Sequence, residues 1–316
     1  MAARFELNLE EHVTKKYLLE IARIAHPLGS TRQENLIRFL DQELKQQNIS
    51  TFLQEFTVKT PNGAALQRGT LPVADTIEKK TFNLLVRFPG VKKCAVALAS
   101  HTDTKSIEYD ISSTPYLGAN DSGSSTAGLI SLAHSLAASI AQKSLKLGGC
   151  SLYLWFFDGE EAQLQSWDDG EKYHPAKIQD NTYGSRYLAS QLVAFENGWT
   201  LPKNIFAVEE KINAVIVLDM IGSKNPIISR DSTSDQTLLN AIEMRLKQNT
   251  IPMAGFMSTI GDDHTAFVKK KIPAADIIDF NNLQDWHKST DTVDKLSLEA
   301  IHKVISAVFA TYYEIY

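Results

Sequence analysis

Ser151-Leu-Tyr-Leu-Trp-Phe-Phe157 is an unbroken apolar run that ends directly at Asp158-Gly-Glu-Glu161. A strand that is apolar throughout is covered on both faces, as in a parallel sheet that has helices on each side. Two further runs have the same character, Cys94–Ser100 and Ala214–Leu218, and Ala274–Ile278 is a weaker one. The sequence therefore predicts a central sheet that is buried on both faces.

Helical patterns lie between and beside these runs. Apolar residues recur at helical spacing at 10–25, 124–141, 183–196, 235–248 and 297–314. Thr31-x-x-Glu34 has the form of a capping box and predicts the start of another helix. Strands that alternate with helices indicate a mainly parallel sheet with helices on both faces.

The earlier part of the chain adds antiparallel strands. Residues 51–58 and 82–88 have strand character, and Pro89-Gly90 is a turn that leads into the next apolar run. We expect a hairpin over 82–100 at one side of the sheet. The fold class that we predict is α/β, a single domain over residues 1–316 with a mixed, mostly parallel central sheet flanked by helices.

Composition excludes several classes of protein. The chain has 316 residues, of which 43% are hydrophobic and 22% charged, as in ordinary globular proteins. Its 37 acidic and 32 basic residues give a net charge of −5 without a basic block, so we expect no nucleic-acid partner. No apolar run approaches the ~20 residues that span a bilayer, and the first residues lack the apolar centre of a signal peptide.

The two cysteines, Cys94 and Cys150, are too few for a disulfide framework or a thiolate zinc site. Each comes directly before or at the start of an apolar strand-like run. We expect two buried thiols, with a bridge as the alternative if the two strands are neighbours.

Polar residues collect where the predicted strands end. His101-Thr-Asp103 follows one strand, Asp158-Gly-Glu160-Glu161 the next, and Asp219 a third. Ligands of open α/β sheets bind outside the carboxyl ends of the strands, so we expect these side chains at one edge. Loops add further polar motifs, which are Gly118-Ala-Asn-Asp121, Gly261-Asp262-Asp263-His264 and Trp286-His287.

This mixture of carboxylates and imidazoles favours a metal site. Oxygen and nitrogen ligands without thiolates suit zinc in an open catalytic site, where three protein ligands leave a position for substrate. A neighbouring carboxylate that does not bind the metal is then free to carry protons. Glu160 and Glu161 fit this division, since adjacent loop residues point in different directions.

Each residue also has a structural alternative. Asp121 could cap the following helix, His101 could bond to the backbone, and Asp219 could orient a ligand. Glu160 and Glu161 could be solvated loop charges, and His287 could be a surface residue. We favour a structural role for Asp158 and a core position for Trp155. We expect the remaining histidines to be structural or solvated; they include His26, His134, His174 and His302.

Together, the ordered motifs resemble zinc peptidase family M28. They are His101-x-Asp103, Gly118-Ala-Asn-Asp121-Ser, Asp158-Gly-Glu160-Glu161, Val217-Leu-Asp219 and the late His287. Within that family the chain is similar to the glutaminyl-peptide cyclotransferases, or glutaminyl cyclases. The similarity rests on Phe156–Ala162, Tyr183–Ala189, Asp262-Asp-His264 and above all Trp286-His287, where ordinary M28 aminopeptidases usually have another residue before the histidine.

Three features depart from the cyclases. The sequence around Asp121 is closer to that of the aminopeptidases. The loop over 163–182 is longer than in the cyclases, so that Trp167 aligns only approximately with a pocket tryptophan. Asn282 stands near the position of an aromatic pocket residue. These departures concern the shape of the substrate pocket more than the type of catalysis.

The resemblance implies roles for particular residues. Asp121, Glu161 and His287 bind one Zn²⁺ per chain, and Glu160 is the general acid and base. Asp262 and Asp219 form a hydrogen-bonded carboxylate network with Glu160. Trp286 lines the pocket, and Trp167 forms another wall.

The activity implied is cyclisation of the N-terminal Gln of peptides or proteins to pyroglutamate, with release of ammonia. The alternatives are an M28 aminopeptidase that uses a metal-activated water, and a catalytically silent binding domain on the same fold. We expect a monomer without a membrane span. The resemblance implies the secretory pathway or secretion, and an intracellular location stays open.

Overall fold

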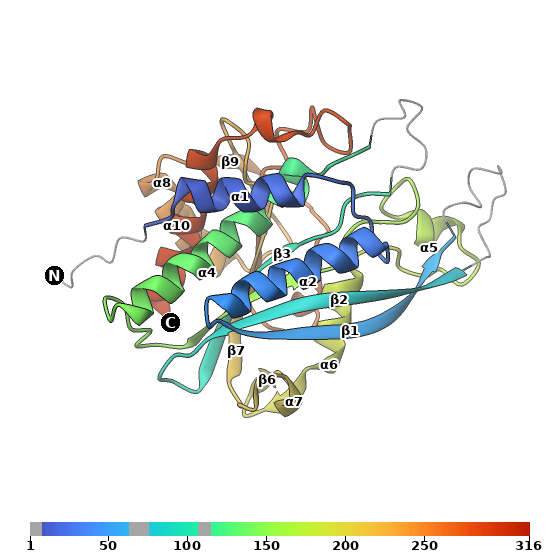
Figure 1. The fold of residues 1–316 in the computed structure, drawn as a ribbon. Helices are drawn as coiled ribbons and strands as arrows, with labels where there is room; N and C mark the ends of the chain where they lie inside the picture. Colours follow the sequence, from blue (N-terminus) through green and yellow to red (C-terminus); the bar gives the residue numbers. More distant parts are fainter. Residues whose placement is uncertain (1–7, 63–75, 107–114) are drawn as a thin grey trace.

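A six-stranded sheet with the strand order β1-β2-β4-β3-β7-β10 lies at the centre of the computed structural model, which describes residues 8–62, 76–106 and 115–316 (Figure 1). The strands are β1 (Ser50–Pro61), β2 (Thr76–Phe88), β3 (Cys94–His101), β4 (Ser151–Phe157), β7 (Lys211–Asp219) and β10 (Ala274–Ile278). β3, β4, β7 and β10 pair in parallel, whereas β1 and β2 add antiparallel pairs at one side. The predicted fold class is confirmed.

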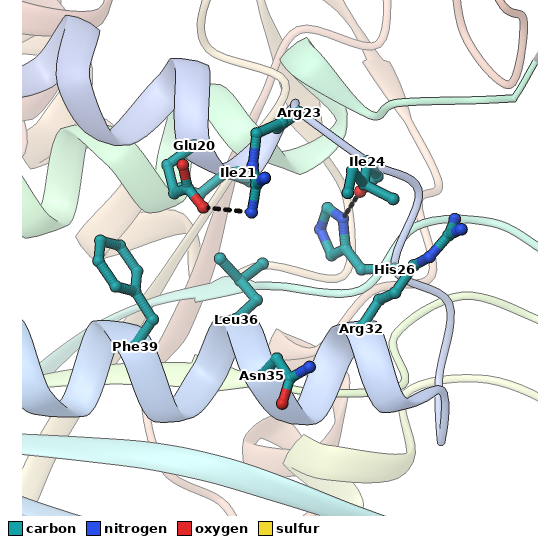
Figure 2. A pocket seen from close by; sticks show the side chains of 9 residues that line it. All are labelled: Glu20, Ile21, Arg23, Ile24, His26, Arg32, Asn35, Leu36 and Phe39. Carbon is teal, nitrogen blue, oxygen red and sulfur yellow. Dashed lines mark hydrogen bonds and ion pairs between the residues drawn. The ribbon is translucent and has the colours of Figure 1, made fainter.

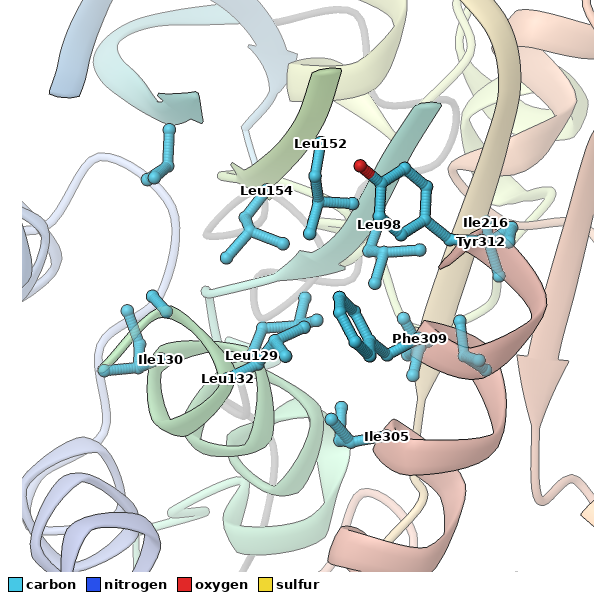
Figure 3. Close-up of a cluster of buried hydrophobic side chains, with 14 of the residues drawn as sticks. Leu98, Leu129, Ile130, Leu132, Leu152, Leu154, Ile216, Ile305, Phe309 and Tyr312 are labelled. Atoms are coloured by element: carbon cyan, nitrogen blue, oxygen red, sulfur yellow. The ribbon is translucent and has the colours of Figure 1, made fainter. Parts of the chain in front are cut away.

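Helices cover both faces of this sheet. The helices of one face are α1 (Glu11–Ile21), α2 (Thr31–Gln46), α4 (Ser125–Ala141), α8 (Gln236–Gln248) and α10 (Leu298–Ile315). The other face is covered by α6 (Tyr183–Gln191), α7 (Lys203–Phe206) and α9 (His264–Val268). Figure 3 shows side chains of α4 and α10, such as Leu129 and Phe309, packed against Leu98 and Leu152 of the sheet.

The apolar runs are explained by this two-sided burial. Along β4, Leu152 and Leu154 face the α4–α10 side, while Tyr153 and Trp155 face the α6–α9 side. Successive side chains of a strand point to opposite faces, so a strand with helices on both sides is apolar at most of its positions. Trp155 is a core residue, as predicted.

The hairpin predicted over 82–100 is wrong. β2 pairs in antiparallel fashion with β4, and β4 lies between β2 and β3 in the sheet. The chain that leaves the turn at Pro89-Gly90 therefore passes β4 and enters β3 on its far side, so β3 does not pair with β2. A local turn motif does not specify which distant strand completes a ladder.

The expectation of two free thiols is also wrong, because Cys94 and Cys150 form a disulfide with a Cα–Cα distance of 4.6 Å. β3 and β4 are neighbours with Ala95 opposite Ser151, which brings the preceding residues together. The bridge joins the amino ends of two central strands.

Two predicted helix ends differ in detail. The side-chain cap of α2 is Ser30, whose hydroxyl accepts a hydrogen bond from Gln33 N, and not Thr31, which begins the helix. α6 ends at Gln191, because Leu192 is extended and leads into β5. The remaining elements are η1 (Ala119–Ser124), α5 (Asp169–Tyr173), β5 (Val193–Phe195), β6 (Gly198–Thr200), β8 (Ile228–Asp231), β9 (Met253–Ser258) and η2 (Val293–Lys295).

Among the described residues, no helix is both long enough and apolar enough to cross a membrane. Residues 1–7 lie outside the described residues, so the structure does not test the expectation that a signal peptide is absent.

Candidate active site

The carboxyl ends of three adjacent strands carry the polar residues, as predicted. His101 is the last residue of β3, Asp219 is the last residue of β7, and Asp158 follows β4 directly. His101 Nε2 lies 3.4 Å from Asp219 Oδ1, and both side chains are buried. The register of the parallel strands therefore places the imidazole and the acids at one edge.

Asp121 is brought to this edge by an irregular turn. Gly118 has φ 59°, and a Cβ there would lie 2.4 Å from the carbonyl oxygen of Asp121, so glycine is required. Asp291 accepts hydrogen bonds from the backbone N–H groups of Asn120 and Asp121 at 2.9–3.2 Å. α4 begins four residues later at Ser125, so Asp121 is not its N-cap.

The Asp121 carboxylate is surrounded by donors. Tyr116 OH donates to Asp121 Oδ2 at 2.7 Å, and His101 Nε2 lies 3.0 Å from Oδ1. Burial alone would raise the pKa of Asp121, but the hydrogen bond and charge of His101, together with His287 and Tyr116, lower it. Asp121 is therefore held as a buried anion.

His101 is oriented by the backbone. Its Nδ1 lies 3.1 Å from the carbonyl oxygen of Asp103, which can only accept, so Nδ1 carries a proton. This leaves Nε2 facing Asp121 and Asp219. Burial lowers the pKa of His101, but nearby carboxylates, led by Glu160, outweigh burial and raise it.

Glu161 and His287 meet on the other side of Asp121. His287 Nε2 lies 3.0 Å from Glu161 Oε1 and 3.4 Å from Asp121 Oδ2. Burial lowers the pKa of His287, and Glu161 and Asp121 raise it above its ordinary value. Lys105 Nζ is 3.9 Å from Glu161 Oε2 and donates to the carbonyl oxygen of Ala162.

Glu160 directly precedes Glu161, and one carboxylate binds the backbone of both residues. Asp103 accepts hydrogen bonds from both backbone N–H groups, at 3.0 Å from Glu160 N and 3.3 Å from Glu161 N. Burial raises the pKa of Glu160, the charges of Asp262, Glu161 and Asp263 raise it further, and His101 partly offsets this. The proton affinity of the Glu160 carboxylate is therefore raised by its surroundings, as suits a group that accepts and returns a proton.

Asp219 and Asp262 lie in the same electrostatic field. Burial and the charge of Asp121 raise the pKa of Asp219 to about 7. Burial also raises the pKa of Asp262, which accepts a hydrogen bond from the backbone N–H of Asp263. Among the described side chains, no direct hydrogen bond joins Asp219 or Asp262 to Glu160, so the network remains a prediction.

Ligand-type atoms converge in two groups that share Asp121. One group is Asp121, Glu161 and His287, and the other is His101, Asp121 and Asp219; within each, one oxygen or nitrogen per residue lies within 4.8 Å of the others. Glu161 Oε2 and Asp219 Oδ1 are buried without a hydrogen-bond partner among the described residues. Buried polar atoms normally have partners, so a cation fits both the chemistry and the unmet acceptors.

Indole rings flank these groups. The ring of Trp286 stacks on His287, with centroids 4.0 Å apart and planes at 26°, and packs edge-on against Phe280. A Cβ on Gly261 would lie 3.2 Å from Trp167 Nε1, so this indole lies against the residue before Asp262. Trp286 therefore lies beside His287, and Trp167 lies beside Gly261; the wall roles of both indoles stay predictions.

A cavity of about 480 Å³ adjoins the first group and is lined in part by Asp121, Trp286 and Asn282. Asn282, the position at which an aromatic residue was expected from the cyclases, donates to Asp279 Oδ2 and to the carbonyl oxygen of Asn225. These bonds attach it to the wall of the cavity.

His26 has a structural role, as predicted. Its backbone N–H donates to Thr104 Oγ1, and its Nδ1 lies 2.7 Å from the carbonyl oxygen of Ile24. It lines a pocket of about 300 Å³ between α1 and α2, with Leu36 and Phe39 on the α2 side (Figure 2). The bond from His26 to Thr104 thereby holds the segment that follows His101.

Several supporting residues had no role in the sequence interpretation. Asp103 was visible only as part of His101-x-Asp103, and Tyr116 lies close before Gly118. Asp291 and Lys105 carried no signal, because their partners are distant in sequence or belong to the backbone.

Comparison with known proteins gives a consistent result. Residues 83–312 match the model of peptidase family M28. The chain is similar to a glutaminyl-peptide cyclotransferase-like protein of Mus musculus, with 28% identity over 92% of this chain and 72% of that protein. It is also similar to the solved glutaminyl cyclase of an Acidobacteriales bacterium, with 26% identity, a TM-score of 0.71, and coverage of 98% of this chain and 94% of that chain.

An aminopeptidase shares the fold. The leucine aminopeptidase precursor of Bacteroides thetaiotaomicron has a TM-score of 0.74 at 18% identity, over 98% of this chain and 99% of that chain. Fold alone therefore does not separate cyclase from aminopeptidase.

Proposed function

The chain belongs to peptidase family M28, and we propose that it is a zinc-dependent glutaminyl cyclase that converts the N-terminal Gln of peptides to pyroglutamate and ammonia. The observation that carries this proposal is the stack of Trp286 on His287, which places an indole directly beside a metal-ligand candidate. An aromatic wall at that position suits a short, flat amide side chain. The cyclase relatives support the same assignment.

Asp121, Glu161 and His287 would hold the zinc ion. Their oxygen and nitrogen atoms are the ligand types of catalytic zinc sites, and three of them leave a position for substrate. Zinc bound there would polarise the side-chain carbonyl of the substrate and stabilise the negative charge that develops on its oxygen.

Glu160 carries the proton in this proposal. Its carboxylate accepts a proton from the substrate α-amine as that nitrogen forms a bond to the side-chain amide carbon. When the bond from this carbon to the amide nitrogen breaks, Glu160 returns the proton to the departing ammonia. The amine and the amide belong to one residue, so little entropy is lost in bringing them together.

The neighbouring groups position Glu160 and the substrate. Asp103 fixes the backbone of Glu160 through its N–H group. The charge of Asp262 raises the proton affinity of Glu160, and Asp219 would join the same carboxylate network. Trp286 and Trp167 would form walls of the pocket that receives the substrate side chain.

The test uses a peptide that begins with Gln and carries an apolar second residue. Mass spectrometry should show loss of ammonia without chain cleavage, and the E160Q variant should form far less product while its zinc is retained. Release of a free amino acid without a cyclised product would reject the cyclase and favour the aminopeptidase.

The aminopeptidase is the second candidate, because His101, Asp121 and Asp219 form a further group of ligand type. A shared Asp121 is what a two-metal hydrolase needs to place metals ~3.5–4 Å apart and activate water. We favour one zinc, since the substrate amine is itself the nucleophile of the cyclisation.

The bridge between Cys94 and Cys150 bears on the compartment. Disulfides persist in oxidising surroundings, so we propose that the protein acts in the secretory pathway or outside the cell. We further propose that it acts as a monomer on peptide or protein substrates.

A further inference from the structure

A basic cavity lies at the edge of the sheet opposite the candidate active site. It has a volume of about 600 Å³ and lies beside Lys211, the first residue of β7, whereas Asp219 ends the same strand at the active site. At ~3.3 Å per residue these two positions are about 26 Å apart. The cavity is also lined by Trp199 of β6, which lies at the same end of β7 (Figure 1).

Four lysines line this cavity and no acid does; the lysines are Lys211, Lys269, Lys270 and Lys271. None of them has an ion-pair partner within the described parts of the chain. The two acids that directly precede Lys211 are engaged elsewhere, since Glu209 pairs with Lys203 and Glu210 with Arg87. In a protein of net charge −5, this is a local concentration of unpaired positive charge, which attracts anions.

The backbone around the lysines is fixed. Trp199 Nε1 donates to the carbonyl oxygen of Lys270 at 2.9 Å, and Lys270 Nζ lies 4.2 Å from the centroid of the indole ring. The N–H groups of Lys269, Lys270 and Lys271 are all bonded to carbonyl oxygens of the preceding turn. The backbone that carries Lys269, Lys270 and Lys271 is therefore held in place, and the indole ring of Trp199 positions the ammonium group of Lys270.

The chemistry of the cavity selects the ligand. Ammonium groups that lie close together repel, and an anion relieves this repulsion in proportion to its charge. A single carboxylate supplies one charge, whereas each phosphate monoester supplies about two at neutral pH. The volume of the cavity is that of a small-molecule site, for which ~300–1,000 Å³ is usual.

We propose that this cavity binds a compact ligand with two or more phosphate groups, held by the ammonium groups of Lys211, Lys269, Lys270 and Lys271. Asn197 and Asn213, which also line the cavity, offer amide N–H groups to the same ligand. The cavity and the candidate active site lie at opposite ends of β7. Binding of a ligand in the cavity therefore does not depend on the proposed cyclisation.

The test measures binding of inositol hexakisphosphate by calorimetry at low salt, with inorganic phosphate for comparison. The site variant is K211E/K270E, and K211Q/K270Q is a second variant that avoids new acids. The matched control is K15E/K146E, which changes the net charge equally at exposed lysines outside the cavity. Vesicles of phosphatidylcholine with and without phosphatidylinositol bisphosphate form the lipid arm.

We expect the wild type and the control to bind inositol hexakisphosphate alike, and inorganic phosphate much more weakly. Both site variants should lose at least about tenfold in affinity, because each removes two charge-assisted contacts. Binding to the vesicles alone, lost in the site variants, would support the site and identify a lipid headgroup as its source. Absence of binding to both probes, or equal binding by the site variants and the control, would overturn the proposal.

Discussion

The carboxylate of Asp103 accepts a hydrogen bond from the backbone N–H of Glu160 at 3.0 Å, so an acid two residues beyond β3 holds the catalytic candidate that follows β4. Its other oxygen accepts the N–H of Glu161 at 3.3 Å. One side chain thus sets the position of both glutamates, the proposed proton carrier and the proposed ligand.

Asp103→Asn should lower kcat/KM and zinc affinity by about 10–100-fold, because the amide NH₂ would face a backbone N–H in place of an acceptor. Cyclisation kinetics and zinc titration measure the two effects. D168N, a change at an exposed carboxylate, is the control. Unaltered kinetics and zinc affinity in D103N would show that the loop holds its shape without this contact.

Glu160→Gln should lower turnover by about 10²–10⁴-fold while one zinc stays bound, because an amide cannot accept the proton of the amine. The control is E171Q in α5, which is exposed. If E160Q lost its zinc, the roles of Glu160 and Glu161 would have to be exchanged. Near-normal turnover would remove Glu160 from the mechanism.

The positions that the sequence predicts correctly depend on short-range information. An apolar run predicts a strand that is buried on both faces, and the residues that follow it lie at the carboxyl edge of the sheet. This reasoning places His101, Glu160 and Asp219 near one another from the sequence alone. The loop motifs of Asp121 and His287 were also visible in the sequence, but their assignment as zinc ligands required the resemblance to a family, because their loops have no periodic pattern.

Long-range pairing could not be predicted in this way. Nothing near Pro89-Gly90 indicates that β4 enters between β2 and β3, and the disulfide follows from that order. The same holds for Asp291, which bonds the backbone of Asn120 from 171 positions away. Such contacts join segments that are distant in sequence, and neither segment has a local pattern that predicts its partner.

Zinc stoichiometry distinguishes the two candidate reactions. We expect one zinc per chain after exhaustive dialysis, lost in D121A and in H287A, because both side chains belong to the proposed ligand group. H101A should keep this zinc, since His101 lies in the other group. Two equivalents in the wild type, with H101A losing one of them and all activity, would favour the aminopeptidase.

The disulfide should contribute substantially to stability. Cys94 and Cys150 are 56 residues apart, and closing a loop of that length in the unfolded chain corresponds to about 4 kcal/mol. C94S/C150S should therefore unfold at lower urea concentration than the oxidised wild type, with cyclisation retained under native conditions, because the bridge lies at the amino ends of the strands. A reductant should lower the urea midpoint of unfolding of the wild type to that of the variant. If the variant had the same midpoint as the oxidised wild type, the disulfide would not stabilise the fold.

Asp158 should make stability fall as the pH rises. The side chain is 1% exposed and accepts a hydrogen bond from the Thr81 hydroxyl; burial, with the charge of Asp103, raises its pKa from 3.8 to about 8. Between these values the folded protein keeps a proton that the unfolded chain has lost. Its stabilising contribution is therefore fully present below pH 3.8 and is lost as the pH rises to about 8.

Asp158→Asn should remove this dependence, because the amide stays neutral and its oxygen can still accept the Thr81 hydroxyl. Urea unfolding of both proteins at intervals from about pH 4 to about pH 9 measures it. The free energy of unfolding of the wild type should fall relative to that of D158N across this range and level off above about pH 8, where Asp158 is ionised in both states. D294N, at an exposed carboxylate, should follow the wild type. Parallel curves for the wild type and D158N would mean that Asp158 is already ionised in the folded protein, and that its surroundings stabilise a charge rather than a proton.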